Sequence, residues 1–189
     1  YNDLAKSFGA EVPFLRPKYL SNSTAKSSWV IIHFIKWYYK KNKSLPTYII
    51  FFPPTNPFLK YKSMQKMIQL VAQKKEFNSI VSFTEPKTHP FRIVKLNKNG
   101  KILNNPILIN GKSINDYERS QDFPKVFEGS PACRITKSKF FLKMLSEQSD
   151  IKKIKYNKTY DYNNAMGYEI SQEESFDIDT KSDFELAQK

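Results

Sequence analysis

The chain has 189 residues, of which 40% are hydrophobic and 26% are charged, and this composition excludes collagen-like, low-complexity and disordered proteins. Its length suits one α/β domain and is short for two. The longest apolar run, Trp29–Ile35, is shorter than the roughly 20 residues that cross a bilayer, so we expect no membrane partner. A single cysteine, Cys133, and a start without a basic and then apolar leader predict a cytoplasmic location.

The formal net charge of +13 raises the question of a polyanionic partner. Only four of the 31 basic residues are arginine, and lysines scattered among many Asn, Ile, Phe and Tyr residues are typical of an AT-rich genome. Residues 171–189 carry six acids and two lysines, a net −4, which leaves a net +17 on residues 1–170. A basic body with an acidic end favours a small polyanion held with a metal. The sequence has no zinc spacing, aromatic platform or basic helix, which argues against general nucleic-acid binding.

The first half of the chain predicts alternating helices and strands. Apolar residues at helical spacing indicate helices, and continuous β-branched and aromatic runs indicate buried strands. Helix–strand–helix–strand order with short loops is typical of a mostly parallel sheet with helices on both faces, in which we expect the two strands to be neighbours. In order, we expect a helix end at Asn2–Phe8 closed by Gly9, a helix from a cap at Ser23 or Thr24 to about Tyr39, a strand at Thr47–Phe52, an amphipathic helix over 61–72 and a strand at Asn78–Thr84.

The pattern changes between Phe91 and Phe127. Short β-like pieces surround Lys98-Asn99-Gly100 and Asn110-Gly111, and no long helix covers the apolar residues of this stretch. We therefore expect a projecting, β-rich arm over 91–127 that pairs with a second copy of the chain. The remainder predicts a strand ending at Arg134–Thr136, a helix at Lys137–Leu145, a polar connector at Ile151–Asp161, a strand at Ser175–Ile178 and a helix capped by Thr180 with Asp183.

Two carboxylates at the last predicted strand are candidate metal ligands. Asp177 and Asp179 are two residues apart, so on a strand they point to the same side and could meet one hard cation. The alternative is a strand-end turn in which Asp179 supports the helix cap. His33, His89 and Cys133 are expected to be packing or loop residues. The sequence has no HExxH, CxxC, GxSxG or Walker motif, so zinc and Ser/His catalysis have no support.

Four short segments follow one another along nearly the whole chain: Gly9-Ala-Glu-Val-Pro-Phe-Leu-Arg-Pro17, Phe52-Pro-Pro-Thr-Asn-Pro57, Arg119-Ser-Gln-Asp122, and Asp177-Ile-Asp179-Thr180 with Asp183-Phe184 and Ala187. Together they resemble the acylneuraminate cytidylyltransferases, the CMP-sialic acid synthetase family. The resemblance implies a single Rossmann-like nucleotidyltransferase domain over 1–189 and a homodimer formed through the arm. It also implies transfer of CMP from CTP to the anomeric hydroxyl of a 2-keto sugar acid, a sialic-acid-like nonulosonate, with Mg2+ and release of pyrophosphate.

The resemblance also implies roles for individual residues. A metal that bridges phosphate oxygens would neutralise the charge that develops during the transfer. The arginines would contact anionic substrate groups, with Arg119 directed by the arm toward the active site of its own chain or of the partner, and the alternative for both is that of surface residues of the arm. The residues concerned are Asp177 and Asp179 for the metal, Arg119 and Arg92 for the anionic groups, and Thr55 and Asn56 for the sugar pocket.

The chain departs from the family at three places. Pro53 stands where the family has a glutamine, and Glu128 stands where some members have a basic residue. The family's first strand and its Arg-, Gly-, Ser- and Lys-containing loop, which binds the triphosphate, have no counterpart in the 189 residues. We therefore expect an N-terminally incomplete enzyme that does not turn over CTP alone. A non-catalytic relative with a binding or structural role is the second hypothesis, and a basic nucleic-acid-binding domain is the third.

Overall fold

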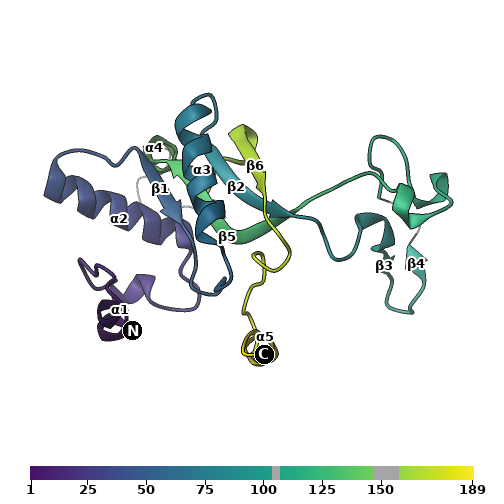
Figure 1. The fold of residues 1–189 in the computed structure, drawn as a ribbon, viewed down its shortest axis with the longest axis horizontal. Coiled ribbons are helices and arrows are strands. Elements are labelled where there is room, and N and C mark those ends of the chain that lie inside the picture. The colour runs from purple at the N-terminus through teal and green to yellow at the C-terminus, as the bar shows by residue number, and fades with distance from the viewer. Residues whose placement is uncertain (104–106, 147–157) are drawn as a thin grey trace. The chain divides into compact units, whose positions relative to one another are not determined.

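The computed structural model describes residues 1–103, 107–146 and 158–189 (Figure 1). The chain forms two compact units, each built from three separate stretches of the sequence. The predicted single domain over 1–189 and its arm at 91–127 stay predictions, and most of the predicted connector at 151–161 lies outside the described residues. The first unit contains residues 1–51, 68–80 and 134–166, and the second contains residues 52–67, 81–133 and 167–189.

A four-stranded sheet runs through the chain in the order β1-β5-β2-β6 (Figure 1). These strands are β1 (Tyr48–Phe51), β5 (Glu128–Lys137), β2 (Ser79–Thr84) and β6 (Ala165–Glu169). Strand β1 is antiparallel to β5, with Tyr48 opposite Lys137 and Phe51 opposite Arg134.

Hydrogen bonds along β2 show the direction of its two neighbours. Lys137 N–H donates to the Asn78 carbonyl at one end of β2, and Ser82 and Cys133 meet near the other, so β5 is antiparallel to β2. Asn78 N–H donates to the Asn164 carbonyl, and Ile170 N–H donates to the Phe83 carbonyl, so β6 is parallel to β2. Strands β1, β2 and β6 therefore share one direction, and β5 alone runs against them.

Two predictions about strands are wrong. The strands at 47–52 and 78–84 are not neighbours, because β5 lies between them. Strand order depends on pairing between distant segments, which local patterns do not encode. The predicted strand at 175–178 is an irregular extended segment, and the sheet instead uses β6, which the sequence analysis did not anticipate.

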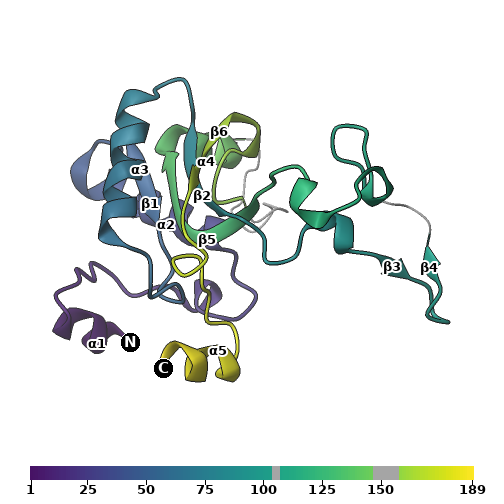
Figure 2. The same cartoon turned by 45° about the vertical axis from the view of Figure 1, so that its right-hand side comes forward.

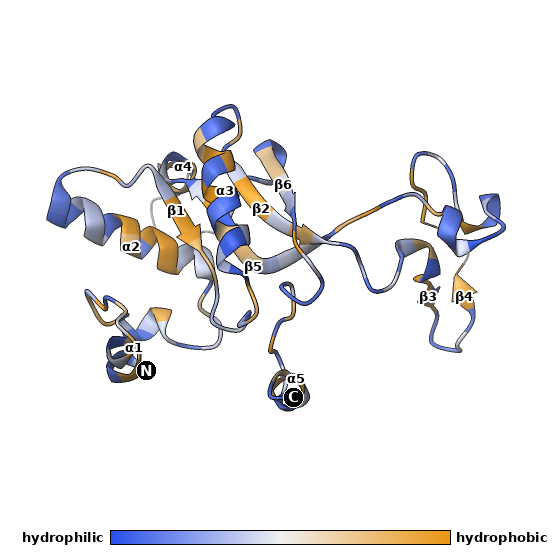
Figure 3. Cartoon of the chain, viewed as in Figure 1, coloured by the Kyte–Doolittle hydropathy of each residue, from blue (hydrophilic) through white to orange (hydrophobic). Residues whose placement is uncertain are grey.

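The helices of the first unit cover both faces of β1. Helices α2 (Ser27–Asn42) and α4 (Ser138–Ser146) pack on the face that presents Ile49. Tyr48, which points to the opposite face, donates its hydroxyl to the Val71 carbonyl of α3 (Tyr61–Gln73) over 3.3 Å. Figure 3 shows β1 and much of α2 in apolar colours. The predicted α/β class, a central sheet flanked by helices, is confirmed. The buried core here is Ile31, Ile32, Ile35, Ile49 and Phe141.

The ends of two predicted helices can be compared with the structure. Helix α1 (Asn2–Ser7) is closed by Gly9 at φ 83°, as expected. Helix α2 begins at Ser27 rather than after a cap at Ser23 or Thr24. The Asn22 side chain accepts from both the backbone N–H and the hydroxyl of Thr24, so this segment forms a turn of its own. None of the described helices is long and apolar enough to cross a membrane.

Short β pieces occur between Phe91 and Phe127, all within the second unit. Strands β3 (Lys95–Leu96) and β4 (Ile102–Leu103) form an antiparallel hairpin (Figure 2). A second tight turn lies at Asn110 and Gly111, whose φ angles are 52° and 77°, as expected of an Asn-Gly hairpin turn. The chain ends in α5 (Lys181–Ala187), where Thr180 and Asp183 form the predicted capping box.

Candidate functional site

Two segments that are far apart in the sequence lie together in the second unit. One is the loop after β1, residues 52–60, and the other is the stretch before α5, residues 171–179. The Ile178 N–H donates to the Thr55 carbonyl over 2.9 Å, and the Asn56 side-chain amide donates to the Phe176 carbonyl over 2.9 Å. The structure therefore brings the predicted sugar-pocket loop beside the predicted metal segment. Asn56 is buried and serves to join the segments, whereas Thr55 is exposed.

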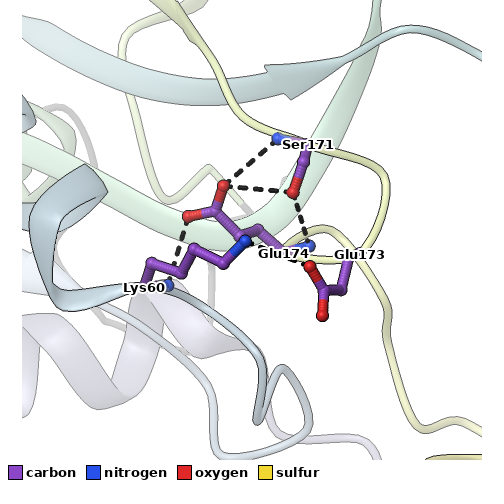
Figure 4. Close-up of polar contacts among 4 residues, drawn as sticks. All are labelled: Lys60, Ser171, Glu173 and Glu174. Carbon is purple, nitrogen blue, oxygen red and sulfur yellow. Dashed lines mark hydrogen bonds and ion pairs between the residues drawn. The ribbon is translucent and has the colours of Figure 1, made fainter.

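A buried carboxylate joins the end of the 52–60 loop to the beginning of the 171–179 stretch. Glu174 is only 5% exposed, and its Oε1 accepts from Lys60 N–H over 3.2 Å (Figure 4). Its Oε2 accepts from the N–H and the hydroxyl of Ser171, over 3.3 and 3.2 Å. The Lys60 ammonium pairs instead with the neighbouring, exposed Glu173 over 3.0 Å. Neutral donors thus satisfy the buried carboxylate.

The pKa of Glu174 reflects two opposing effects. Burial raises the pKa, but hydrogen bonds from Ser63, Ser171 and Lys60 lower it, and the net effect is a pKa below the ordinary value of 4.5. Glu174 is therefore ionised at neutral pH. It lies beside the first turn of α3, where the helix dipole also favours a negative charge.

A cavity of about 220 Å³ lies next to the joined segments, within the second unit. Carboxylates dominate its charge, since Lys87 is its one cationic lining residue against three acids. Asp177 is half-buried, and its Oδ1 is shielded from solvent without a hydrogen-bond partner. Thr55, Asn56 and Asp179 do not line this cavity. Its lining comprises Thr84, Lys87, Glu128, Gln172, Ser175, Phe176, Asp177 and Asp183.

The structure treats the two predicted metal carboxylates differently. Asp179 is exposed, and its backbone N–H donates to Asp183 over 3.2 Å. Asp183 also accepts from the N–H and hydroxyl of Thr180, and these hydrogen bonds lower its pKa. The described part of the chain contains no group of three His, Cys, Asp or Glu residues arranged for a metal. Asp177, with its unpartnered buried oxygen, is thus the carboxylate that best fits a cation.

The two predicted arginines do not line the cavity of their own chain. Arg119 is exposed and makes a two-point contact with Asp122, Nε to Oδ2 over 3.0 Å and Nη2 to Oδ1 over 3.2 Å. Arg92 is also exposed and ends a short 3-10 helix at Pro90–Arg92. The structure of one chain places both on the segment predicted to be the arm.

The other singled-out side chains have packing roles, as expected. His33 packs edge-on against Phe14 with ring centroids 5.0 Å apart. His89 accepts from Phe91 N–H at Nδ1, which leaves Nε2–H to donate to the Pro124 carbonyl over 3.0 Å. Cys133 is fully buried in β5.

A second, larger cavity lies within the first unit. It has a volume of about 510 Å³, and the segment resembling the family between Gly9 and Pro17 contributes much of its wall. That segment supplies Val12, Phe14 and Arg16, and Asn22 also lines the cavity.

The sequence analysis missed the residues that hold the site together. Lys60, Ser171 and Glu174 were not singled out, nor was Lys87 in the cavity wall. One signal was present: Ser171-Gln-Glu-Glu174 has the spacing of a capping box, and the two residues do make the reciprocal contacts of that motif. Only a turn follows, so the helical context that normally identifies the motif is absent from this segment.

Comparisons with known proteins add a structural likeness. No family model matches the chain, and no curated protein matches its sequence. The chain is similar to a solved structure described as 4-diphosphocytidyl-2C-methyl-D-erythritolsynthase from Anaerococcus prevotii DSM 20548, with 12% sequence identity and a TM-score of 0.44. The match covers 79% of this chain and 62% of that chain.

Proposed function

We infer that this chain belongs to a cytidylyltransferase that moves CMP from CTP to the anomeric hydroxyl of a 2-keto sugar acid and releases pyrophosphate, and that it contributes sugar-binding and metal-binding residues. The observation that carries the proposal is the pair of hydrogen bonds from Asn56 to Phe176 and from Ile178 to Thr55. They bring together two of the four segments that resemble the CMP-sialic acid synthetase family. A transferase needs its acceptor and the reacting phosphate in contact, so these segments belong in one site.

Mg2+ is part of the proposal because of the state of Asp177. A hard cation prefers carboxylate oxygens, and Asp177 Oδ1 is a buried acceptor beside the cavity with no hydrogen bond to satisfy it. Asp179, two residues on and outside the cavity lining, is assigned as the second ligand on the resemblance alone. When bound, the ion would neutralise charge on the phosphate oxygens during transfer.

The arginines are assigned to anionic substrate groups in the proposal. Arg119 is held by Asp122 in this structure, so it must exchange that partner for a phosphate or carboxylate. The exchange is inexpensive because exposed ion pairs contribute about 0–1 kcal/mol. We assign Arg92 the same function.

We also propose a homodimer formed through residues 91–127. This stretch exposes several large apolar side chains, which a solvated surface would not favour in such number. A second copy would cover them and could direct Arg119 into its neighbour's site. The exposed side chains are Ile93, Val94, Leu96, Ile102, Leu103, Ile107, Leu108, Ile114 and Phe127.

Pyrophosphate release tests the function directly. The full-length protein is mixed with CTP, Mg2+ and each member of a panel of 2-keto sugar acids, and release is followed with a coupled phosphate assay. We expect release that depends on both CTP and one or more sugar acids. Parallel reactions with ATP, GTP and UTP test the nucleotide. Absence of release with every acceptor would contradict the proposal and favour a non-catalytic relative.

A further inference from the structure

We propose that Glu174 is a positioning residue, whose buried carboxylate fixes the loop after β1 against the Asp177 segment. As a statement about catalysis this rests on the proposed function, whereas as a statement about order in the two segments it stands on the structure alone. No hydrogen bond to a substrate is assigned to Glu174. It would act through Lys60 and Ser171.

The contacts between the two segments form a short antiparallel ladder. Lys60 contacts Glu174, Asn56 contacts Phe176 and Thr55 contacts Ile178. Residue numbers therefore decrease along one segment as they increase along the other. Phe58 and Phe176 add a ring contact within the ladder, with centroids 5.8 Å apart. Glu174 is the charged end of this ladder.

The position of Asp177 follows from the ladder. Its two neighbours, Phe176 and Ile178, are each hydrogen-bonded to the loop through a backbone atom. The backbone of Asp177 is therefore held on both sides, and its side chain is directed to the cavity wall. Two residues before Asp177, Ser175 donates its hydroxyl to the Ser130 hydroxyl over 2.9 Å, which attaches the segment to the part of β5 in the same unit.

The site of Glu174 requires a carboxylate rather than an amide. Both of its oxygens face donors: Lys60 N–H on one side, and the N–H and hydroxyl of Ser171 on the other. A glutamine would turn its NH2 group toward one of these donors whichever way the amide were placed. Glu174 is only 5% exposed, so little water can take the place of the lost acceptor at this position.

The adjacent residue, Glu173, offers a matched control. It has the same charge, lies one position away and contacts the same lysine, but through the exposed Nζ rather than the backbone N–H. Glu173→Gln therefore removes an equal charge from the same turn without affecting the ladder. A difference in amide exchange or in kinetics between Glu174→Gln and Glu173→Gln therefore reports the loss of the buried contacts and not the loss of charge.

Hydrogen–deuterium exchange tests the ladder. In the full-length protein, Glu174→Gln is expected to raise amide exchange about tenfold or more in peptides covering 55–60 and 175–178, because local opening becomes easier there. Exchange in β2 should stay unchanged, and Glu173→Gln should resemble the wild type in all three regions. Unchanged exchange in the ladder, or an equal rise in β2, would overturn the proposal. If Glu174→Gln does not fold, Glu174→Asp, which keeps the charge but is one methylene shorter, decides by the same criterion.

Steady-state kinetics test the link to catalysis. A displaced Asp177 segment should lower kcat by about tenfold or more, while the KM for CTP changes less than about threefold. A change in KM for CTP alone would overturn the positioning role in catalysis. If the wild type releases no pyrophosphate, the proposed function fails, and the exchange experiment still decides whether Glu174 orders the two segments.

Discussion

The side-chain amide of Asn56 donates to the backbone carbonyl of Phe176 over 2.9 Å, a contact between residues 120 positions apart in the chain. Asn56 is 5% exposed, so the bond is shielded from water. Replacing Asn56 with alanine leaves the Phe176 carbonyl without this donor. We expect Asn56→Ala to lower the free energy of unfolding by about 1–3 kcal/mol, measured by urea denaturation.

Asn42→Ala is the control for that measurement. Asn42 also donates its side-chain amide to a backbone carbonyl, that of Tyr38 over 3.0 Å, but it does so on an exposed helix end. Asn42→Ala should lower the free energy of unfolding by less than about 0.5 kcal/mol, as is usual for surface positions. Equal losses from the two variants would mean that burial of the Asn56 bond has no energetic importance.

The stability contributed by Glu174 should depend on pH. Its pKa is below 4.5 in the folded protein, because hydrogen bonds from Ser63, Ser171 and Lys60 outweigh the effect of burial. A lowered pKa stabilises the fold above the unfolded value, and that stability is lost as the pH falls through the folded value. The difference in unfolding free energy between wild type and Glu174→Gln should thus be greatest near neutrality and shrink below about pH 4.5. A difference that stays constant down to about pH 3 would contradict this account.

The capping box of α5 gives a second prediction on pH. The Thr180 hydroxyl and N–H lower the pKa of Asp183, so the cap is complete above the ordinary value of 3.8 and weakens as the pH falls through the lowered one. Thr180→Ala should raise the Asp183 pKa toward 3.8 and speed amide exchange in α5, both followed by NMR. Ser182→Ala, in the same turn of the helix, should do neither.

The proposed metal site predicts a large catalytic effect at two positions. Asp177→Asn and Asp179→Asn should each lower the rate of pyrophosphate release by about 100-fold or more, because phosphate charge would be left uncompensated. Glu185→Gln serves as the control, since Glu185 pairs with Lys181 on the surface of α5. Unchanged rates in both aspartate variants would refute the metal assignment.

The proposed dimer predicts that a single substitution lowers the mass of the assembly in solution. Leu108 is 62% exposed on the stretch assigned to the arm, and Leu108→Lys would place a charge among its apolar residues. Analytical ultracentrifugation at micromolar protein should show a dimer for the wild type and a shift toward monomer for the variant. Leu186→Lys, at a comparably exposed leucine on α5, should leave the mass unchanged. A monomeric wild type would contradict the proposal.

Local patterns were sufficient to predict most helices and turns of this chain. The apolar spacing along 61–72 identified α3, the Thr180 and Asp183 pair identified the cap of α5, and Asn110-Gly111 identified a tight turn. Each of these features depends on residues a few positions apart. The sheet order does not: β5 fits between β1 and β2 through pairing with residues that are distant in the sequence.

The same distinction between local and long-range information applies to the candidate site. The resemblance to a family assigned Asn56 to the sugar pocket and Asp177 to the metal, and the ladder joins the two segments that carry these residues. It did not predict that Glu174 is buried while Glu173 is exposed, because two adjacent glutamates in a polar run look alike in sequence. The difference arises from Lys60 N–H and Ser63, which are brought to Glu174 only by the folded loop.

The ladder also bears on how the protein is made. A ribosome releases residues 52–60 long before residues 171–178, so the loop has no partner for most of synthesis. Unit two likewise draws on three separate stretches of the chain, the last of which begins at Gly167. The loop at 52–60 can therefore reach its folded contacts only after residues 171–178 have been made, and a ribosome that stalls before Glu174 would leave a product without the ladder.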